Sequence, residues 1–418
     1  MTITLVPPAP APAPAVADPL AVLGVPGQVN LDHAASAPCA RAAADAVAEL
    51  LPWYASVHRG AGALSRRCTL AYERARQTVG DFLGARAGDH VIFTRNTTDA
   101  LNLLARALPA GTTVVTFAGE HHANLLPWPR GSVRLPVPQS PGAAVRALDA
   151  ALAELRRGAG SALPVLVAVT GASNVTGERW PLAELARTAR RHGARIVVDA
   201  AQLAPHASVD VAALDVDYLA VSGHKLYAPF GAGVLLGRAD WLDTAPPYLA
   251  GGGATSHVGA ATHEVRWTTG PARHEGGTPN LLGAVALAAV CAALAGADRA
   301  ALHAHEQRLL ARLRNGLAAL PDAVELRTFG PDAPRVGIVS FVLAGRDSAE
   351  VAAALARDGV GVRDGLFCAH PLARRLLAEA AARSGRTDLP PTALRASVGL
   401  GSTEEHVDRL LAGLAALR

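Results

Sequence analysis

Lys225 is the residue of this sequence best suited to covalent chemistry. The chain has 39 Lys and Arg residues, and Lys225 is its one lysine. The other 38 are Arg, and a GC-rich genome that favours Arg codons over Lys codons would account for this excess. A position that keeps lysine under such pressure can need an amine that loses its proton, which Arg cannot supply. Such an amine forms Schiff bases when a desolvated, positively charged site lowers its pKa.

The place of Lys225 in the sequence supports this interpretation. It ends the segment SGHK, which follows the apolar run Tyr218–Val221 and precedes a loop rich in Pro and Gly. Ligands of α/β sheets bind at the carboxyl ends of the strands. The alternative is an ordinary surface lysine after a strand.

Asp199 is the second candidate, because it ends the β-branched run IVVD. A buried carboxylate needs a partner, and a positively charged ring nitrogen would serve as one. Gln202, three residues later, could donate to a neighbouring oxygen. The alternative is an Asp that caps the next helix.

Two further segments complete a candidate ligand site. Thr97 and Thr98 stand at the expected start of a helix, whose free N–H groups and hydroxyls favour an anion. His121 lies in GEHHAN, after an apolar strand, where it could lie flat on an aromatic cofactor or transfer a proton. Helix capping and an exposed loop histidine are the respective alternatives.

The elements that position these residues alternate along the chain, which predicts βαβ units and a mostly parallel sheet. Expected helices are Arg41–Leu51, Ala71–Leu83, Asp99–Leu108, Leu281–Leu294, Ala301–Leu320, Ala349–Asp358 and Glu404–Leu417. Expected strands are Val91–Thr94, Val114–Phe117, Val165–Val169, Ile196–Asp199, Tyr218–Val221, Val234–Leu236 and Val336–Leu343.

The expected organisation has four parts. Residues 1–20 form a disordered Ala/Pro-rich tail without the basic start of a signal peptide. Residues 21–40 pack with the small domain. Residues 41–285 form a large ligand-binding domain, and residues 286–418 form a small C-terminal α+β domain.

Composition excludes several classes of protein. Half of the 418 residues are hydrophobic and 18% are charged, which is typical of a globular protein. The net charge of +4 is small and aromatic residues make up 4%, so we expect no nucleic-acid partner. No apolar run reaches the ~18 residues of a membrane span. Four cysteines without a CxxC pair indicate a reducing compartment, and we expect a cytoplasmic protein without a metal.

These residues together resemble the class V aminotransferase group of pyridoxal 5'-phosphate (PLP) enzymes, and most closely the SufS-like cysteine desulfurases and selenocysteine lyases. The resemblance runs from about residue 30 to the C-terminus. It rests on the ordered segments NLDHAASAP, VHRGAGALS, TRNTTDALNL, GEHHANLLPW, SNVTGERWPL, VDAAQ, SGHKLYAPFGAGVL, GGGATS, HEGGTPN and RASVGLGSTEEHVDRL. It implies the α/β architecture of aspartate aminotransferase (fold type I), with a mainly parallel seven-stranded sheet in the large domain.

The resemblance also implies a role for each candidate residue. Lys225 would bind PLP covalently, Asp199 would pair with the ring nitrogen, and His121 would stack on the ring. The remaining cofactor contacts would come from Thr97, Thr98, Asn174, Gln202, Ser222 and His224, and from Thr278 acting across a homodimer. Substrate contacts would come from Arg395, His58, Arg59 and Asn174.

Cys368 decides the type of reaction that the resemblance implies. It falls where the desulfurase nucleophile falls, and nearby Arg363 and His370 could favour its thiolate. The other three cysteines are expected to be small apolar core residues. The loop departs from the family pattern, because Leu366 and Phe367 stand in place of paired histidines before the cysteine. The stretch of residues 373–394 is also longer than usual.

Three interpretations follow. In the first, the enzyme removes sulfur from L-cysteine, gives L-alanine and a Cys368 persulfide, and passes the sulfur to an acceptor protein. In the second, the chain is an aminotransferase, C–S β-lyase or epimerase that acts on another amino acid, and Cys368 is not catalytic. The third, a scaffold protein without catalysis, is disfavoured by the intact Lys225, Asp199 and Arg395.

Overall fold

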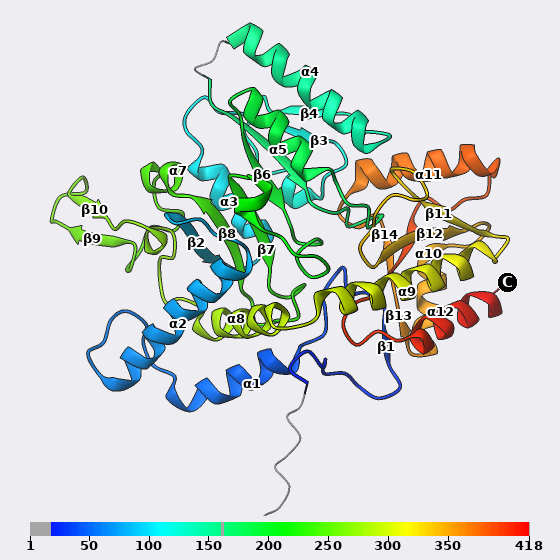
Figure 1. Ribbon diagram of the computed structural model, residues 1–418, viewed down its shortest axis with the longest axis horizontal. Helices are drawn as coiled ribbons and strands as arrows, with labels where there is room; N and C mark the ends of the chain where they lie inside the picture. Colours follow the sequence, from blue (N-terminus) through cyan, green and yellow to red (C-terminus); the bar gives the residue numbers. More distant parts are fainter. Residues whose placement is uncertain (1–17, 160–162, 418) are drawn as a thin grey trace, which may run out of the picture.

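The computed structural model describes residues 18–159 and 163–417. The chain folds into a large and a small domain that lie side by side (Figure 1). Most of the expected N-terminal tail lies outside the described residues. Within the described part no single helix is both long and apolar enough to span a membrane, although one pair of helices bent by 93° passes that test together.

The large domain is built on a seven-stranded sheet of order β2-β8-β7-β6-β5-β3-β4. β8 runs antiparallel to both of its neighbours, and the other neighbouring strands are parallel. The expected α/β fold with a mainly parallel sheet is therefore confirmed. The strands are β2 (Asp89–Thr94), β3 (Thr113–Phe117), β4 (Val133–Leu135), β5 (Val165–Thr170), β6 (Arg195–Asp199), β7 (Tyr218–Ser222) and β8 (Gly233–Arg238).

Both faces of this sheet are covered, which explains why its strands are almost wholly apolar. In β5, Val167 belongs to the core with α4 and α5, whereas Leu166 belongs to the core with α3. The helices of this domain are α1 (Arg41–Leu50), η1 (Leu51–Trp53), α2 (Ala63–Phe82), α3 (Thr97–Ala107), η2 (His122–Asn124), α4 (Pro141–Ala159), α5 (Leu182–Arg191), α6 (Val211–Leu214), α7 (Ala239–Thr244), η3 (Pro271–Arg273) and α8 (Leu281–Ala295). A hairpin of β9 (Thr255–Val258) and β10 (Val265–Trp267) extends from it (Figure 1).

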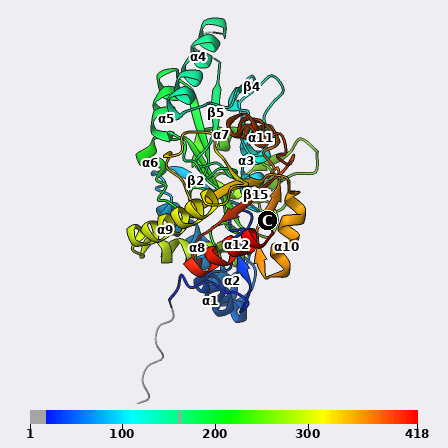
Figure 2. The same cartoon turned by 90° about the vertical axis from the view of Figure 1, so that its right-hand side faces the viewer.

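The small domain has an antiparallel sheet of order β11-β12-β15-β14. Figure 2 shows this domain facing the viewer. A short N-terminal strand pairs with its β13. The elements are β1 (Val29–Asn30), α9 (Arg299–Ala318), β11 (Ala323–Leu326), β12 (Ile338–Leu343), α10 (Ser348–Arg357), β13 (Val360–Gly361), β14 (Arg363–Gly365), α11 (His370–Ser384), β15 (Ala393–Ser397) and α12 (Glu404–Ala416). Residues 373–394, where the resemblance implied an insert, comprise most of α11, the loop after it and the start of β15.

The expected domain boundary between residues 285 and 286 falls inside the continuous helix α8. This helix packs against α1 and α2 of the large domain. The next helix, α9, places Leu309, Leu313 and Leu317 in the core of the small domain. We therefore place the boundary at residues 296–298, where the chain bends between the two helices.

A buried ion pair ties the two domains together. Glu178 follows β5 and accepts hydrogen bonds from the backbone N–H groups of Thr328 and Phe329, at 2.8 and 2.9 Å. The guanidinium of Arg335 donates to the same carboxylate at 3.1 Å, and both side chains are almost fully buried. Gly177 allows this approach, because it has φ +72° and a Cβ there would stand 2.6 Å from the carbonyl oxygen of Ile338.

Replacing Glu178 with alanine is expected to lower the free energy of unfolding by about 3–5 kcal/mol, because the buried Arg335 keeps only Glu325 as a carboxylate partner. The backbone N–H groups of Thr328 and Phe329 also lose their acceptor. Urea unfolding followed by tryptophan fluorescence measures the change. The control is Glu184→Ala, whose carboxylate pairs with Arg187 on the surface at 3.6 Å. This control substitution should lower the free energy of unfolding by less than about 1 kcal/mol. Equal losses in both variants would show that Glu178 does not secure the domain junction.

Candidate active site

A cavity of about 270 Å³ lies at the carboxyl ends of β5, β6 and β7, where the small domain meets the sheet. Most of the residues expected from the sequence line it: Thr97, Thr98, His121, Asn174, Asp199, Gln202, Ser222, His224, Lys225, Cys368 and Arg395. Parallel strands explain this convergence, because their carboxyl ends meet at one edge of the sheet. The small domain contributes Arg363, Phe367, Cys368 and Arg395.

Lys225 lies in the turn that follows β7 and faces the cavity. Burial lowers the pKa of its amine to about 8, against the opposing effect of the Asp199 carboxylate, while Arg395 lowers it further. A lysine in this environment carries a substantial fraction of neutral amine near neutral pH. It can therefore act as a nucleophile and as a base.

Asp199 ends β6 on the floor of the cavity. Its Oδ1 accepts a hydrogen bond from the N–H of Ala201 at 3.0 Å, and 5% of the residue is exposed. Burial raises the pKa of this carboxyl, which means that its charge lacks full compensation in the protein alone. A cationic ring nitrogen would supply that compensation.

The start of α3 forms an anion seat. The N–H of Thr97 donates to the Ser222 hydroxyl at 2.8 Å, and that hydroxyl donates to Thr97 Oγ1 at the same distance. The seat also depends on glycine at position 233, since a Cβ there would stand 2.5 Å from Cα of Asn96. The N-terminus of an eleven-residue helix and two hydroxyls therefore face one point of the cavity.

His121 is a neutral imidazole in this site. Burial lowers its pKa to about 3, and Lys225 lowers it further. Nδ1 accepts a hydrogen bond from the N–H of Ala123 at 3.0 Å, so the ring proton is on Nε2. These contacts suit an uncharged ring that packs on a flat ligand better than one that titrates near neutral pH.

Arg395 lies at the small-domain side of the cavity and is 3% exposed. One terminal nitrogen donates to the backbone carbonyl of Asn174 and the other to Asp32 Oδ1, both at 3.0 Å. Its Nε is buried without a hydrogen-bond partner among the described residues. Asp32 lies in the segment NLDH, but no local pattern marks it as a site residue, because its partner Arg395 is 363 positions away. An arginine held in this way suits a carboxylate ligand.

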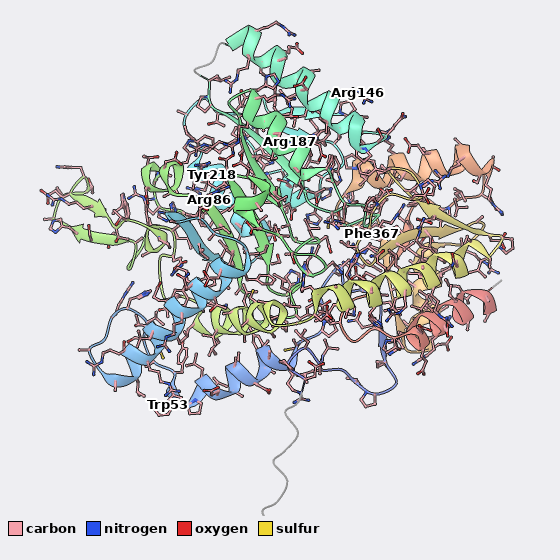
Figure 3. The ribbon with its side chains drawn as sticks, viewed as in Figure 1. Trp53, Arg86, Arg146, Arg187, Tyr218 and Phe367 are labelled. Carbon is pink, nitrogen blue, oxygen red and sulfur yellow. The ribbon has the colours of Figure 1, made fainter. Side chains whose placement is uncertain are left out.

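Cys368 is exposed and sits on a turn just before α11. Phe367 and Cys368 have φ angles of 53° and 51°, in the left-handed region that side chains with a Cβ disfavour. Each such residue costs about 1–3 kcal/mol, so the surroundings must hold the turn. Figure 3 shows Phe367 at the junction of the two domains. The thiol is thus carried into the cavity by a strained element of the small domain.

Three expected site residues lie elsewhere in the single chain. His58 Nε2 contacts Glu73 at 2.8 Å, and the Arg59 guanidinium packs on Gly253. Thr278 borders a separate hollow beside Tyr248. His58 and Arg59 therefore do not line the cavity of their own chain, where they were expected to contact the substrate. The expectation for Thr278 concerned the cofactor of a partner subunit, so its place outside this cavity does not contradict it.

Glu120 is a fully buried carboxyl behind the cavity. It accepts hydrogen bonds from the N–H of Thr170 at 3.1 Å and from the Asn124 amide at 2.8 Å. Burial raises its pKa to about 8, and the charge of Asp199 acts in the same direction. The unfolded chain therefore releases this proton at lower pH than the folded chain. The contribution of Glu120 to stability is present below about pH 4.5 and is lost as the pH rises to about 8.

The Glu120→Gln variant is expected to flatten the dependence of the free energy of unfolding on pH between 5 and 8, by up to about 1.4 kcal/mol per pH unit. The Gln amide can donate to Asn124 Oδ1, which is buried without a partner among the described residues. Urea unfolding of both proteins at a series of pH values measures the difference. Parallel curves would show that Glu120 titrates as an ordinary carboxyl.

Known proteins are similar to this chain in sequence and in fold. The family model of aminotransferase class V matches residues 29–410. A cysteine desulfurase of Dickeya dadantii is 38% identical over 397 residues, which cover 92% of this chain and 90% of that protein. A cysteine desulfurase of Cronobacter sakazakii is 36% identical, with 92% of each chain covered.

Solved structures agree with the sequence relatives. The apo structure of cysteine desulfurase from Thermococcus onnurineus NA1 superposes with a TM-score of 0.80 at 31% identity, covering 95% of this chain and 99% of that one. The cysteine desulfurase CsdA (S-sulfonic acid) from Escherichia coli gives a TM-score of 0.76 at 30% identity, covering 93% and 94%. This chain belongs to the aminotransferase class-V family.

Proposed function

We propose that this chain is a PLP-dependent cysteine desulfurase that converts L-cysteine into L-alanine and keeps the sulfur as a persulfide on Cys368. The observation that carries the proposal is the convergence of Lys225, Arg395 and Cys368 on one cavity. They supply an amine of lowered pKa, a cation for a carboxylate and an exposed thiol. Relatives named cysteine desulfurase support the same activity.

The residues of the cavity fit PLP. Thr97, Ser222 and the start of α3 suit its phosphate, and the undercompensated Asp199 suits its ring nitrogen. His121 offers a neutral ring for its face. His224 and Gln202 also line the cavity. When bound, PLP supplies an aldehyde for amines and a cationic ring that draws electrons from the Cα of an amino acid.

The protein groups then divide the remaining work. Arg395 binds the carboxylate of the amino acid and orients its Cα and sulfur. The amine of Lys225 takes the Cα proton, since its lowered pKa leaves it partly unprotonated. The thiolate of Cys368 attacks the substrate sulfur, so that an S–S bond forms and the Cβ–S bond breaks. The electron pair of that bond goes to the carbon side, and protonation there gives alanine. An external thiol later removes the sulfur by exchange.

We also infer a homodimer and a cytoplasmic location. Thr278, His58 and Arg59 have the residue types expected of a cofactor and substrate site but lie away from the cavity of their own chain. A second copy that offers these loops to the cavity would account for them. The four cysteines of the chain are free, which suits a reducing compartment where an acceptor protein could take the sulfur as a persulfide.

The test is to incubate the purified, PLP-loaded protein with L-cysteine and a reducing thiol, and to quantify sulfide, alanine and pyruvate. Sulfide with an equal amount of alanine is expected. Sulfide with pyruvate would instead identify a C–S β-lyase. No turnover while PLP stays bound would exclude L-cysteine as the substrate and favour another amino acid.

A further inference from the structure

The turn that carries Cys368 cannot be held by its own backbone preference. Phe367 and Cys368 are consecutive residues with left-handed φ angles of 53° and 51°, and neither is glycine. Such a pair relaxes unless contacts from outside the turn keep it in place.

Two hydrogen bonds from the large domain provide these contacts. The side-chain amide of Asn174 donates to the carbonyl oxygen of Phe367 at 2.7 Å. The backbone N–H of His122 donates to the carbonyl oxygen of Cys368, also at 2.7 Å. Asn174 follows β5 and is 7% exposed, so its bond is protected from water. The turn belongs to the small domain, and both bonds therefore cross the domain junction.

Asn174 also contacts Arg395, the arginine that is expected to bind the substrate carboxylate. Its backbone carbonyl accepts a hydrogen bond from Arg395 at 3.0 Å. The Arg395 guanidinium also lies 5.0 Å from the centroid of the Phe367 ring. Asn174 therefore contacts both Arg395 and the turn that carries the thiol of Cys368.

We propose that Asn174 is a positioning residue for Cys368: its side-chain amide tethers the Phe367–Cys368 turn so that the thiol faces the cavity. The inference rests on the proposed function, since it treats Cys368 as the nucleophile. It adds a role for Asn174 beyond contact with cofactor or substrate. Without the amide, the Phe367 carbonyl loses its donor, and the strained turn moves away from the cavity.

The test measures the reactivity of Cys368 without any substrate. Asn174→Ala and Asn174→Leu both remove the donor, and the leucine keeps the number and branching of the side-chain heavy atoms. The PLP-loaded proteins are treated with iodoacetamide, and alkylation at each cysteine is followed by mass spectrometry. Cys39, which is half-buried and distant from the turn, is the control within each sample. Cys368 should react about fivefold faster in both variants, as expected for the loss of one buried hydrogen bond, while Cys39 stays unchanged.

Two further measurements separate positioning from substrate binding. In a single turnover with L-cysteine, persulfide formation on Cys368 should fall by about tenfold or more, because the thiol is misplaced. The midpoint of the change in PLP absorbance on adding L-alanine, which has no sulfur, should shift by a smaller factor than the fall in persulfide formation. Unchanged alkylation of Cys368, with amino-acid binding and persulfide formation lost together, would overturn the proposal and leave Asn174 as a substrate contact. If the unmodified protein forms no persulfide, the proposed function fails, but the alkylation comparison still decides whether Asn174 tethers the turn.

Discussion

Replacing Lys225 with alanine is expected to lower turnover of L-cysteine by at least about 10⁴-fold. The variant loses both the amine that binds PLP covalently and the base that takes the Cα proton. No second lysine can replace it, because the chain has only this one. The measurement combines sulfide release with the absorbance of bound PLP, which should no longer show the band of a covalent link to the protein.

Lys225→Arg is the matched variant for this experiment. It keeps a positive charge beside Asp199 but cannot lose its proton. Turnover should therefore be lost as fully as in the alanine variant, although the arginine retains the charge. A small primary amine added to Lys225→Ala should restore part of the activity by acting as the missing base. Substantial turnover by the arginine variant would remove Lys225 from the mechanism.

Cys368→Ser is expected to abolish the formation of sulfide and alanine from L-cysteine, by about 10³-fold or more, while PLP and the amino acid still bind. A serine hydroxyl is a poor nucleophile toward sulfur, but it leaves Lys225 and Arg395 in place. Product analysis and the change in PLP absorbance on adding L-cysteine measure the two steps separately.

Cys39→Ser is the control for this variant. Its thiol is half-buried and donates to a backbone carbonyl, outside the set of residues that line the cavity. It should keep the activity of the unmodified protein. Sulfide release that survives in Cys368→Ser, with pyruvate as the second product, would identify elimination and make Cys368 a bystander.

Both predictions depend on a cavity that neither domain forms alone. The large domain contributes the amine, the buried acid and the anion seat at the ends of parallel strands. The small domain contributes the thiol of Cys368 from the turn before α11 and the guanidinium of Arg395 from β15. The buried pair of Glu178 and Arg335 holds the two sets of residues in register. Replacing Glu178 should therefore lower the activity as well as the free energy of unfolding.

The sequence by itself determined the strands that end at the site and the residues on those ends. Apolar runs such as those of β5, β6 and β7 are local signals, and sheets of this kind bring their carboxyl ends together. Lys225 and Asp199 could be found from type and position alone. The expected helix at residues 71–83 captured only the second half of α2, because its first turns are polar and exposed on most sides.

Only the tertiary structure decided the contacts between distant segments. Asp32 meets Arg395 across 363 positions, and Asn174 meets Phe367 across 193. The domain boundary after α8 and the placement of Thr278, His58 and Arg59 outside the cavity are likewise not encoded in any local pattern. The physical reason is that periodicity and capping act over a few neighbouring residues. Pairing across the domain junction depends instead on how two separately packed cores meet.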